Sequence, residues 1–256
     1  MKTEIVPLRA FRDNYIWAVH NGRHAAVIDP GDAAPVLEFL RAGDLRLCAV
    51  LCTHHHADHV GGCAQLGFEY NVPIIGPAAE RIAALTTRVR GGDCVTIPEL
   101  ALRFDVLDIP GHTAGHIAFT GHGWLFCGDT LFSVGCGRLF EGTPAQMHAS
   151  LLKLASLPDH TQVFCGHEYT AGNIRFATLV EPDNAALLAL RDKVDALTRQ
   201  GLPSLPSLMG EERSVNPFLR TAVPEVRAAA ERRAQRILDD DVAVFAVLRD
   251  WKNQPS

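Results

Sequence analysis

The sequence lacks the features that mark a membrane, exported or disulfide-bonded protein. A membrane-spanning helix needs roughly 20 apolar residues, and the best apolar run, at residues 242–248, is far shorter. Residues 1–7 lack the long apolar stretch of a secretory signal. The seven cysteines include no C-x-x-C pair, and several lie in apolar runs. We therefore expect reduced thiols in the core of a cytoplasmic protein.

The sequence also has little net charge and no repeats. The net charge is −5 and the pI is near 6.2, which argues against a general nucleic-acid binder. We see no internal repeat and no low-complexity tract. The hydrophobic share is 47% and the charged share 21%, as in an ordinary globular protein, and 256 residues suffice to bury a core. We expect a monomer with no nucleic-acid partner and no membrane partner.

Histidine is confined to one part of the chain. All twelve histidines lie between His20 and His167. Residues 1–170 hold 12 Lys and Arg against 17 Asp and Glu, whereas residues 171–256 hold 12 of each. The two parts therefore differ in chemistry, and we predict two domains, residues 1–170 and residues 171–256.

The first part is predicted to consist of strands and loops with occasional helices. β-Prone runs separated by turn-forming residues predict strands at residues 2–8, 14–19, 24–29, 45–52, 102–109, 117–120, 124–127 and 162–165. Helices are predicted at residues 34–42 and from Thr143, an N-cap type followed by proline. In the second part, helical periodicity predicts a helix at residues 184–200, with further candidates at 223–238 and 241–251. Residues 201–217, which include two prolines near their start, are predicted to be a linker.

The strongest chemical signal is the run T-H-H-H-A-D-H at residues 53–59, directly after a predicted buried strand. His54 and His56 are two residues apart, so in an extended turn both can face one side, and Asp58 and His59 can face a second point. Imidazole and carboxylate together suit Zn²⁺, Fe or Mn. A polar surface loop or a single structural metal site is the plainer interpretation. The H-x-H-x-D-H pattern favours a metal centre, because it is far more restrictive than a lone histidine.

Three more potential ligands follow predicted strands. His112, Asp129 and His167 each come directly after a glycine, which lets the backbone turn sharply at the end of the strand. Strand ends that hand polar side chains to loops are how α/β enzymes build sites. Each of these pairs is weak alone, because a Gly-His pair is usually a turn. Together with the first cluster they make seven donors, which matches two metals that share one carboxylate.

These motifs resemble the metallo-β-lactamase fold superfamily and, within it, the glyoxalase II (hydroxyacylglutathione hydrolase) family. The resemblance covers nearly the whole chain, and besides the donors it includes residues 13–15 (DNY), 29–31 (DPG), 135–138 (GCGR), 166–170 (GHEYT) and 216–220 (NPFLR). The histidine cluster identifies only the superfamily, whereas residues 166–170 and the helical C-terminal part narrow it to glyoxalase II. The resemblance implies an α/β fold, an αββα sandwich with the site at one edge, followed by a small C-terminal helical domain that helps to bind substrate.

The resemblance also implies two metal sites. One would take His54, His56 and His112, and the other Asp58, His59 and His167, with Asp129 as the bridge. The expected cofactors are two divalent metal ions per chain, zinc first, with iron or manganese compatible with the same ligands. Asp58 is also assigned as catalytic. Asp29 and His116 would support the ligands from behind, although Asp29 is equally well explained as a turn residue, and His55 is expected to point away.

Substrate recognition in this family implies a pocket for glutathione, whose carboxylates require cations. Arg249 and Lys252 resemble the pair that holds the glycine carboxylate in the family. From the residues alone, a solvated helix end favoured by the helix dipole is the simpler interpretation. Arg138 and Tyr169 correspond to further glutathione contacts. Phe140 stands where some members have tyrosine, so we expect one hydrogen bond to be missing and binding to be weaker by about 0.5–1.5 kcal/mol.

The implied reaction is hydrolysis of S-2-hydroxyacylglutathione, especially S-D-lactoylglutathione, to a 2-hydroxy acid (D-lactate) and glutathione, the second step of methylglyoxal degradation. Metal-activated water would be the nucleophile, and the absence of a G-x-S-x-G motif disfavours a serine hydrolase. Other enzymes of the superfamily are the alternative: a persulfide dioxygenase with one iron, a lactonase or a β-lactamase. A non-catalytic metal-binding module is a third hypothesis, which predicts bound metal without turnover.

Overall fold

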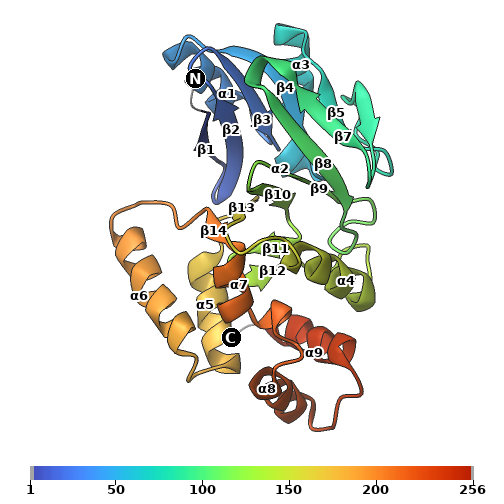
Figure 1. Cartoon of the computed structure of the whole chain (residues 1–256), viewed down its shortest axis with the longest axis vertical. Helices are drawn as coiled ribbons and strands as arrows, with labels where there is room; N and C mark the ends of the chain where they lie inside the picture. The colour runs from blue at the N-terminus through green and yellow to red at the C-terminus, as the bar shows by residue number, and fades with distance from the viewer. Residues whose placement is uncertain (1–2, 255–256) are drawn as a thin grey trace. The chain divides into compact units, whose positions relative to one another are not determined.

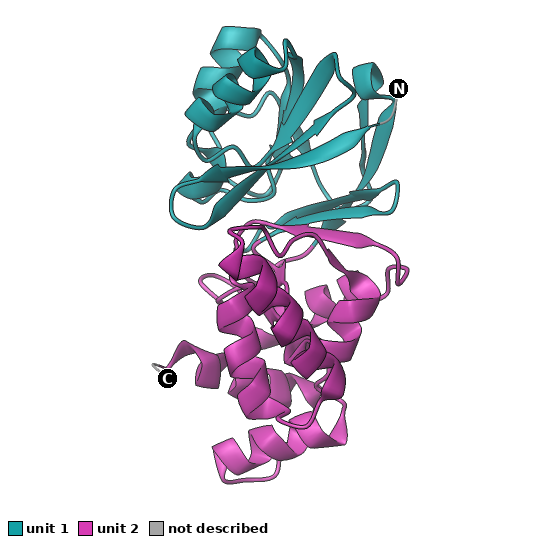
Figure 2. Cartoon of the chain, turned by 90° about the vertical axis from the view of Figure 1, so that its left-hand side faces the viewer, with its two compact units in different colours: residues 1–108, 113–128 teal, residues 109–112, 129–256 magenta. Residues whose placement is uncertain are grey.

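The computed structural model describes residues 3–254, and the order of its elements can be followed in Figure 1. The chain forms two compact units (Figure 2). Unit 1 comprises Met1–Asp108 and Thr113–Gly128, and unit 2 comprises Ile109–His112 and Asp129–Ser256. Residues 129–170, which the sequence division assigns to the first part, thus group with the C-terminal helices. The predicted domain division at residue 170 stays a prediction.

The first sheet of unit 1 has the strand order β1–β2–β3–β4–β5–β6. Its strands are β1 (Glu4–Ala10), β2 (Asn14–His20), β3 (His24–Ile28), β4 (Arg46–Leu51), β5 (Ile74–Pro77) and β6 (Thr87–Val89). The first three pair antiparallel, and β3 to β6 pair parallel. Parallel neighbours need a crossover, which helix α1 (Ala33–Ala42) supplies between β3 and β4. The segments that follow β3 and β4 therefore leave the sheet at the same edge.

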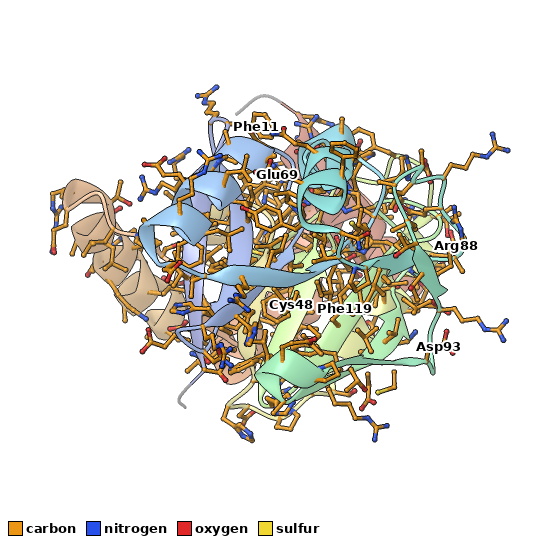
Figure 3. All side chains as sticks on the ribbon, turned by 90° about the horizontal axis from the view of Figure 1, so that it is seen from above. Phe11, Cys48, Glu69, Arg88, Asp93 and Phe119 are labelled. Carbon is orange, nitrogen blue, oxygen red and sulfur yellow. The ribbon has the colours of Figure 1, made fainter. Side chains whose placement is uncertain are left out.

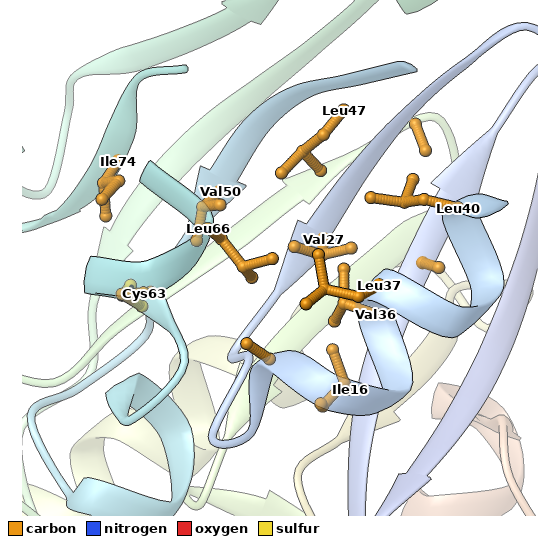
Figure 4. Packing of buried hydrophobic residues seen from close by; sticks show 14 of the residues in the cluster. Ile16, Val27, Val36, Leu37, Leu40, Leu47, Val50, Cys63, Leu66 and Ile74 are labelled. Atoms are coloured by element: carbon orange, nitrogen blue, oxygen red, sulfur yellow. Dashed lines mark hydrogen bonds between the residues drawn. The ribbon is translucent and has the colours of Figure 1, made fainter. Parts of the chain in front are cut away.

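Helices α1 and α3 (Cys63–Tyr70) pack on this sheet through one apolar cluster, shown in Figure 4. Burying a Leu or Val side chain contributes about 1.5–3 kcal/mol, so the cluster fixes the strands whose ends carry polar residues. Asp32 caps α1 by accepting a hydrogen bond from the Ala34 N–H at 2.9 Å. The labelled members of the cluster are Ile16, Val27, Val36, Leu37, Leu40, Leu47, Val50, Cys63, Leu66 and Ile74.

Unit 1 also contains an antiparallel run of strands, β7 (Cys94–Ile97), β8 (Leu102–Asp108), β9 (Ile117–Gly121) and β10 (Trp124–Gly128), with the short helix η1 (Pro98–Leu100) between β7 and β8. The first residues of β8 alternate between buried and exposed, as expected for a strand with one face in the core. Figure 3 shows Phe119 of β9 among the packed side chains, whereas Phe11 and Arg88 lie at the edge. Phe119 is fully buried and Phe11 is 63% exposed.

Unit 2 is mainly helical. A hairpin of β11 (Leu131–Phe132) and β12 (Gly135–Cys136) precedes α4 (Pro144–Ala155), which begins with a capping box of Thr143 and Gln146. Strand β13 (Gln162–Cys165) pairs antiparallel with β14 (Ser207–Leu208). The other elements are α5 (Thr170–Val180), α6 (Ala185–Arg199), α7 (Met209–Val215), η2 (Pro217–Leu219), α8 (Pro224–Ala234) and α9 (Asp241–Asn253). One apolar cluster joins Val134 of the hairpin to α5, α6 and Val215 of α7.

Most sequence-based element predictions are confirmed within one to three residues, apart from residue 2 of the first strand, which lies outside the described residues. The prediction of a linker at residues 201–217 is wrong, because β14, α7 and Pro217, the first residue of η2, lie there. The predicted helix at 223–238 ends earlier, at Ala234, where Gln235 takes a left-handed conformation. Among the other elements that were not predicted are helices α2 (Ala57–Val60), α3 and α5 and strands β5, β6, β7, β11 and β12.

Two expectations from composition can be compared with the structure. None of the seven cysteines, all of which lie within residues 3–254, forms a disulfide. Five are buried, but Cys94 is exposed and Cys48 is half-buried. Burial raises the pKa of the Cys48 thiol to about 12. Within residues 3–254 no helix combines the length and the apolar character that crossing a membrane would demand.

Candidate metal centre

The loop that follows β4 and the short helix α2 (Ala57–Val60) present the four potential metal ligands of unit 1. His54 and His59 are buried, with 0% and 1% of their surface exposed, whereas His56 and Asp58 are half-buried. His54 Nε2 lies 3.2 Å from His56 Nδ1. The candidate ligand atoms of His54, His59 and Asp29 all lie within 4.8 Å of one another. The loop therefore brings imidazole and carboxylate groups together as a metal ion requires.

Asp29 orients two of these imidazoles. It follows β3 in a left-handed conformation, with φ of 54°, and its Oδ2 lies 3.1 Å from His59 Nδ1. The same oxygen accepts a hydrogen bond from the Thr53 hydroxyl at 2.7 Å, and that hydroxyl oxygen lies 3.0 Å from His54 Nδ1. Because a carboxylate can only accept, His59 carries a proton on Nδ1. The Thr53 hydroxyl gives its own proton to Asp29, so its oxygen accepts from His54, which therefore also carries a proton on Nδ1. The Nε2 lone pairs of His54 and His59 are thereby left for a metal.

Asn14 and Gly31 place Asp58. Asn14 Nδ2 donates to Asp58 Oδ2 at 2.9 Å and to the Asp58 carbonyl at 3.3 Å. A Cβ atom on Gly31 would lie 1.9 Å from the Asp58 carbonyl oxygen, so only glycine permits this close approach. Asp58 Oδ2 lies 3.6 Å from His59 Nε2. The DNY and DPG motifs of the sequence thus support the loop, although neither supplies a predicted metal ligand.

The two remaining histidines around the loop occupy different environments. The ring of His116 stacks on that of His54, with centroids 4.5 Å apart, and its Nδ1 lies 3.0 Å from the Ile117 carbonyl oxygen. His55 is directed to Glu80, whose Oε2 lies 3.0 Å from His55 Nδ1. Glu80 is buried, with 5% exposed, and it also accepts a hydrogen bond from the Thr113 hydroxyl. His116 therefore contacts a predicted ligand, and His55 pairs with a carboxylate that the sequence analysis did not single out.

The other three predicted ligands come together within unit 2. Asp129 Oδ2 lies 3.5 Å from His112 Nε2 and 3.2 Å from His167 Nε2. All three residues are buried, with 4–6% exposed. His112 Nδ1 lies 2.9 Å from the Arg138 carbonyl oxygen, which can only accept a hydrogen bond. Nδ1 of His112 therefore carries the proton, and its Nε2 lone pair is directed to the side of Asp129.

The chemistry of these donors fits divalent metal ions. In three of the predicted histidine ligands, His54, His59 and His112, Nδ1 faces an oxygen acceptor, so Nε2 is the ring atom available to a metal. Buried imidazoles and carboxylates without lysine or arginine among them suit zinc, iron or manganese. Neither cluster includes a cysteine, which distinguishes both from a typical structural zinc site.

Aromatic residues surround the unit 2 cluster. The ring of Tyr169 stacks on His167, with centroids 4.8 Å apart and an interplanar angle of 6°. Phe132 contacts both rings edge-on, at 5.9 Å from His167 and 5.1 Å from Tyr169. Phe140 is 62% exposed, and its ring lies 5.2 Å from that of His112. Tyr169 and Phe140 are thus both next to predicted ligands and partly open to solvent.

The two cations of α9 both contact buried polar groups, although Arg249 is buried and Lys252 is half-buried. Arg249 is only 4% exposed, and its guanidinium donates to the Cys136 carbonyl at 2.7 Å. The Lys252 ammonium contacts Asn173 Oδ1. Burial, and then the nearby charge of Arg249, lower the pKa of Lys252 to about 7. The interpretation of these residues as a solvated helix end is therefore wrong, because both have buried polar partners.

Comparison with known proteins matches both parts of the chain. Residues 9–167 match the family described as metallo-beta-lactamase superfamily, and residues 168–255 match hydroxyacylglutathione hydrolase C-terminus. The hydroxyacylglutathione hydrolase of Nitrosomonas eutropha is 54% identical over 98% of this chain and 98% of its own length. The chain belongs to the hydroxyacylglutathione hydrolase family. It is therefore a hydrolase.

Solved structures agree with this membership at the level of fold. The crystal structure of ETHE1 from Myxococcus xanthus is 25% identical, covers 100% of this chain and 92% of its own, and has a TM-score of 0.67. The structure of TTHA1623 in a di-iron-bound form is 29% identical over 64% of this chain and 91% of its own, with a TM-score of 0.52. The predicted metallo-β-lactamase fold with a C-terminal helical region is thus confirmed for this hydroxyacylglutathione hydrolase family member.

Sequence reasoning missed three residues that shape the site. Asn14 had a signal, since it lies in the DNY motif that carried the resemblance, but the motif alone gave it no role. Thr53 stands in the histidine run, and its hydroxyl links Asp29 to His54. Glu80 had no signal, because its partners His55 and Thr113 are 25 and 33 residues away.

Proposed function

We propose that this protein is a metal-dependent thioester hydrolase that converts S-2-hydroxyacylglutathione and water into a 2-hydroxy acid and glutathione. Its expected substrate is S-D-lactoylglutathione, which gives D-lactate. The main support is the 54% identity to a hydroxyacylglutathione hydrolase over 98% of both chains. Donors oriented for metal, four in unit 1 and three in unit 2, supply the chemistry that such a reaction needs.

The proposed centre holds two divalent metal ions. His54, His56 and His112 would hold one, and Asp58, His59 and His167 the other, with Asp129 shared between them. Two metal ions, when bound, lower the pKa of water and polarise a carbonyl group. Zinc is the first candidate, and iron and manganese accept the same donors. The di-iron form of the similar protein TTHA1623 supports a count of two.

The protein's own groups would position the nucleophile. Asp58, with one carboxylate oxygen tied to Asn14, is proposed to accept a hydrogen bond from the attacking water and to set its direction. Asp29 and His116 keep the imidazoles in place. The leaving group is a thiolate, whose conjugate acid has a pKa near 8.5 for a model thiol, so departure requires no dedicated general acid.

The proposed glutathione contacts come from unit 2. Arg249 and Lys252 would provide cations for a carboxylate, and Tyr169, whose ring stacks on the proposed ligand His167, would offer its hydroxyl. Arg138 and Phe140 flank His112, the former through its carbonyl and the latter through its ring. Without the hydroxyl of a tyrosine, Phe140 can offer only apolar contact.

The wider setting is also a proposal. We infer a cytoplasmic monomer that acts in methylglyoxal degradation and binds neither nucleic acid nor membrane. We further infer that residues 171–256 form a helical substrate-binding domain after a metal-binding domain at residues 1–170. Support for that division comes from the two family matches, which meet between residues 167 and 168.

The test is hydrolysis of S-D-lactoylglutathione, followed by loss of thioester absorbance, with elemental analysis of the same sample. Wild-type protein is expected to turn over and to hold two metal ions per chain. His56→Ala removes one donor and is expected to lose at least about 100-fold in kcat/KM, together with metal. The matched control is His160→Ala, which removes an exposed histidine and should leave both unchanged.

Each alternative gives a different result in that test. A persulfide dioxygenase would hold one iron per chain, and a non-catalytic module would bind metal without turnover. Thioester hydrolysis that persists in metal-depleted His56→Ala protein would refute the proposed mechanism.

A further inference from the structure

The turn of the β11–β12 hairpin holds a strained residue. Ser133 and Val134 connect the two strands, and Val134 has φ of 56°. A β-branched residue rarely takes this left-handed conformation, because its side chain crowds the backbone. Val134 is fully buried and Ser133 is 3% exposed. Water therefore cannot satisfy the polar backbone of this turn, and other groups must hold it.

Three buried side chains from α5, α7 and the residue after α7 hold the turn. The Glu212 carboxylate accepts a hydrogen bond from the Val134 N–H at 2.8 Å. Asn173 Nδ2 donates to the Ser133 carbonyl at 2.8 Å. Asn216 Nδ2 donates to the carbonyls on both sides of the turn and to Glu212 Oε2, the last at 3.0 Å. We call Asn173, Glu212 and Asn216 the clamp; each is no more than 3% exposed.

The fit between clamp and hairpin is tight. A Cβ atom on Gly135 would lie 2.4 Å from Asn173 Nδ2, so the backbone of the hairpin approaches that amide as closely as glycine allows. Figure 1 shows α5, α7 and the hairpin as neighbours, in agreement with these contacts. Burial raises the pKa of Glu212 to about 6, and the hydrogen bonds from the Val134 N–H and the Asn216 amide oppose that rise.

The hairpin carries groups on the substrate side of the proposed site. Phe132, the last residue of β11, contacts the rings of His167 and Tyr169. The carbonyl of Cys136 in β12 accepts the hydrogen bond from Arg249. Asn173 of the clamp is also the contact of the Lys252 ammonium. A shift of the turn would therefore displace an aromatic wall and both proposed carboxylate-binding cations.

We propose that the clamp positions the groups that bind substrate. Glu212, with Asn173 and Asn216, holds Val134 in its strained conformation. The hairpin in turn keeps the proposed substrate contacts in place, namely Phe132, Tyr169, Arg249 and Lys252. This inference rests on the proposed function. None of the three clamp residues is proposed to touch the reacting atoms. Loss of the clamp should therefore weaken substrate binding and spare metal loading.

The test compares Glu212→Ala with Glu211→Ala, a neighbour on the same helix that bears the same charge and faces Lys193 at 3.7 Å. Glu212→Ala is expected to raise KM for S-D-lactoylglutathione about tenfold, with kcat within about threefold and metal content unchanged. Hydrogen exchange at residues 131–137 should speed up in Glu212→Ala and stay as in the wild type in Glu211→Ala. Glu212→Gln keeps an acceptor oxygen and should return KM to within about twofold of the wild type.

Val134→Gly provides the decisive rescue. Glycine adopts the left-handed conformation freely, so in the Glu212→Ala background it should restore much of KM. It also removes a buried side chain, so the melting temperature should fall further. A purely structural role for Glu212 cannot move these two quantities in opposite directions.

Each outcome decides the inference. A Glu212→Ala protein with normal KM and only a lower melting temperature overturns it, as does a Val134→Gly double variant without rescue. If Glu212→Ala does not fold, Glu212→Asp is measured in its place, with the same expected direction, and a normal KM overturns the inference there too. Wild-type protein that lacks thioesterase activity would instead overturn the proposed function, and exchange at residues 131–137 would then decide whether the clamp holds the turn.

Discussion

Asp29 shows how one carboxylate prepares several donors at once. Through its two oxygens it accepts from the Thr53 N–H at 2.7 Å and from the Thr53 hydroxyl, and it faces His59 Nδ1. Asn in its place keeps only one acceptor oxygen. We expect Asp29→Asn to weaken metal binding about 10–100-fold, measured by competition with a chelator of known affinity.

Asp44→Asn is the matched control for that variant. Asp44 also has a positive φ, 48°, but its side chain is exposed and lies outside the metal loop. Its metal affinity should equal that of the wild type. Equal affinity in Asp29→Asn as well would mean that the carboxylate forms a turn and does not support the ligands.

Phe140 offers a second prediction at the level of one side chain. Its ring lies beside His112 and is largely exposed, so an added hydroxyl meets no obstacle from burial. If substrate lies there, Phe140→Tyr gains a hydrogen bond of about 0.5–1.5 kcal/mol, which lowers KM about two- to tenfold with little change in kcat. Phe68→Tyr, at a residue that is 93% exposed on α3, is the control. An unchanged KM in Phe140→Tyr would place glutathione elsewhere.

The proposed role of Lys252 in helix α9 predicts that substrate binding depends on pH. Because burial lowers the pKa of Lys252 to about 7, its ammonium loses the proton as pH rises through 7. The glycine carboxylate of glutathione stays ionised over this range. We therefore expect kcat/KM for S-D-lactoylglutathione to fall as pH rises above about 7, since this quantity reports groups of the free enzyme.

Lys252→Arg separates this effect from other titrations. The guanidinium stays charged up to pH 12, so kcat/KM in this variant should lose the decline above pH 7. The profile is measured from pH 6 to 9 with the same thioester. A decline that persists in Lys252→Arg would assign the titration to another group.

At the scale of elements, the sequence predicted those helices and strands that have a hydrophobic period or a turn signal at their ends. Strands β2, β3 and β4 and helices α1, α6 and α9 all have such signals, and all were predicted. Helix α7 has only seven residues, Met209–Val215, too few for a helical period to stand out. Its position depends on Glu212 and Asn216, whose partners at Phe132, Val134 and Gly135 are 78 to 84 residues away. Contacts at such separations leave no local pattern, so residues 201–217 were mistaken for a linker.

At the scale of the whole molecule, polar residues that follow the ends of predicted strands were the signal that indicated the proposed site. All seven predicted donors lie in segments that follow a strand, with Asp58 and His59 in the short helix α2 after β4. Within each unit they gather with their predicted neighbours. The residues that orient them could not be predicted in the same way. The sequence favoured two interpretations of Asp29 equally, a support for the ligands and a turn-forming residue. Asn14 is 44 residues away from Asp58 in the sequence, so no local pattern links them.

The proposed centre takes donors from both units, so metal should stabilise the whole chain. A ligand that binds only the folded state adds about 4 kcal/mol at 1,000 times its Kd, which for a chain of this size corresponds to a shift in melting temperature on the order of 10 °C. Chelation is expected to lower the melting temperature by about that amount, and added zinc should restore it.

Scanning calorimetry of three proteins checks this prediction. His160→Ala should respond to the chelator as the wild type does, because His160 is exposed and lies outside both clusters. His56→Ala should already melt low and respond little. A wild-type melting temperature that ignores the chelator, in a sample shown to have lost its metal, would mean that the ions do not tie the two sets of donors together. The seven residues would then be two separate clusters, and a shared dinuclear centre would be ruled out.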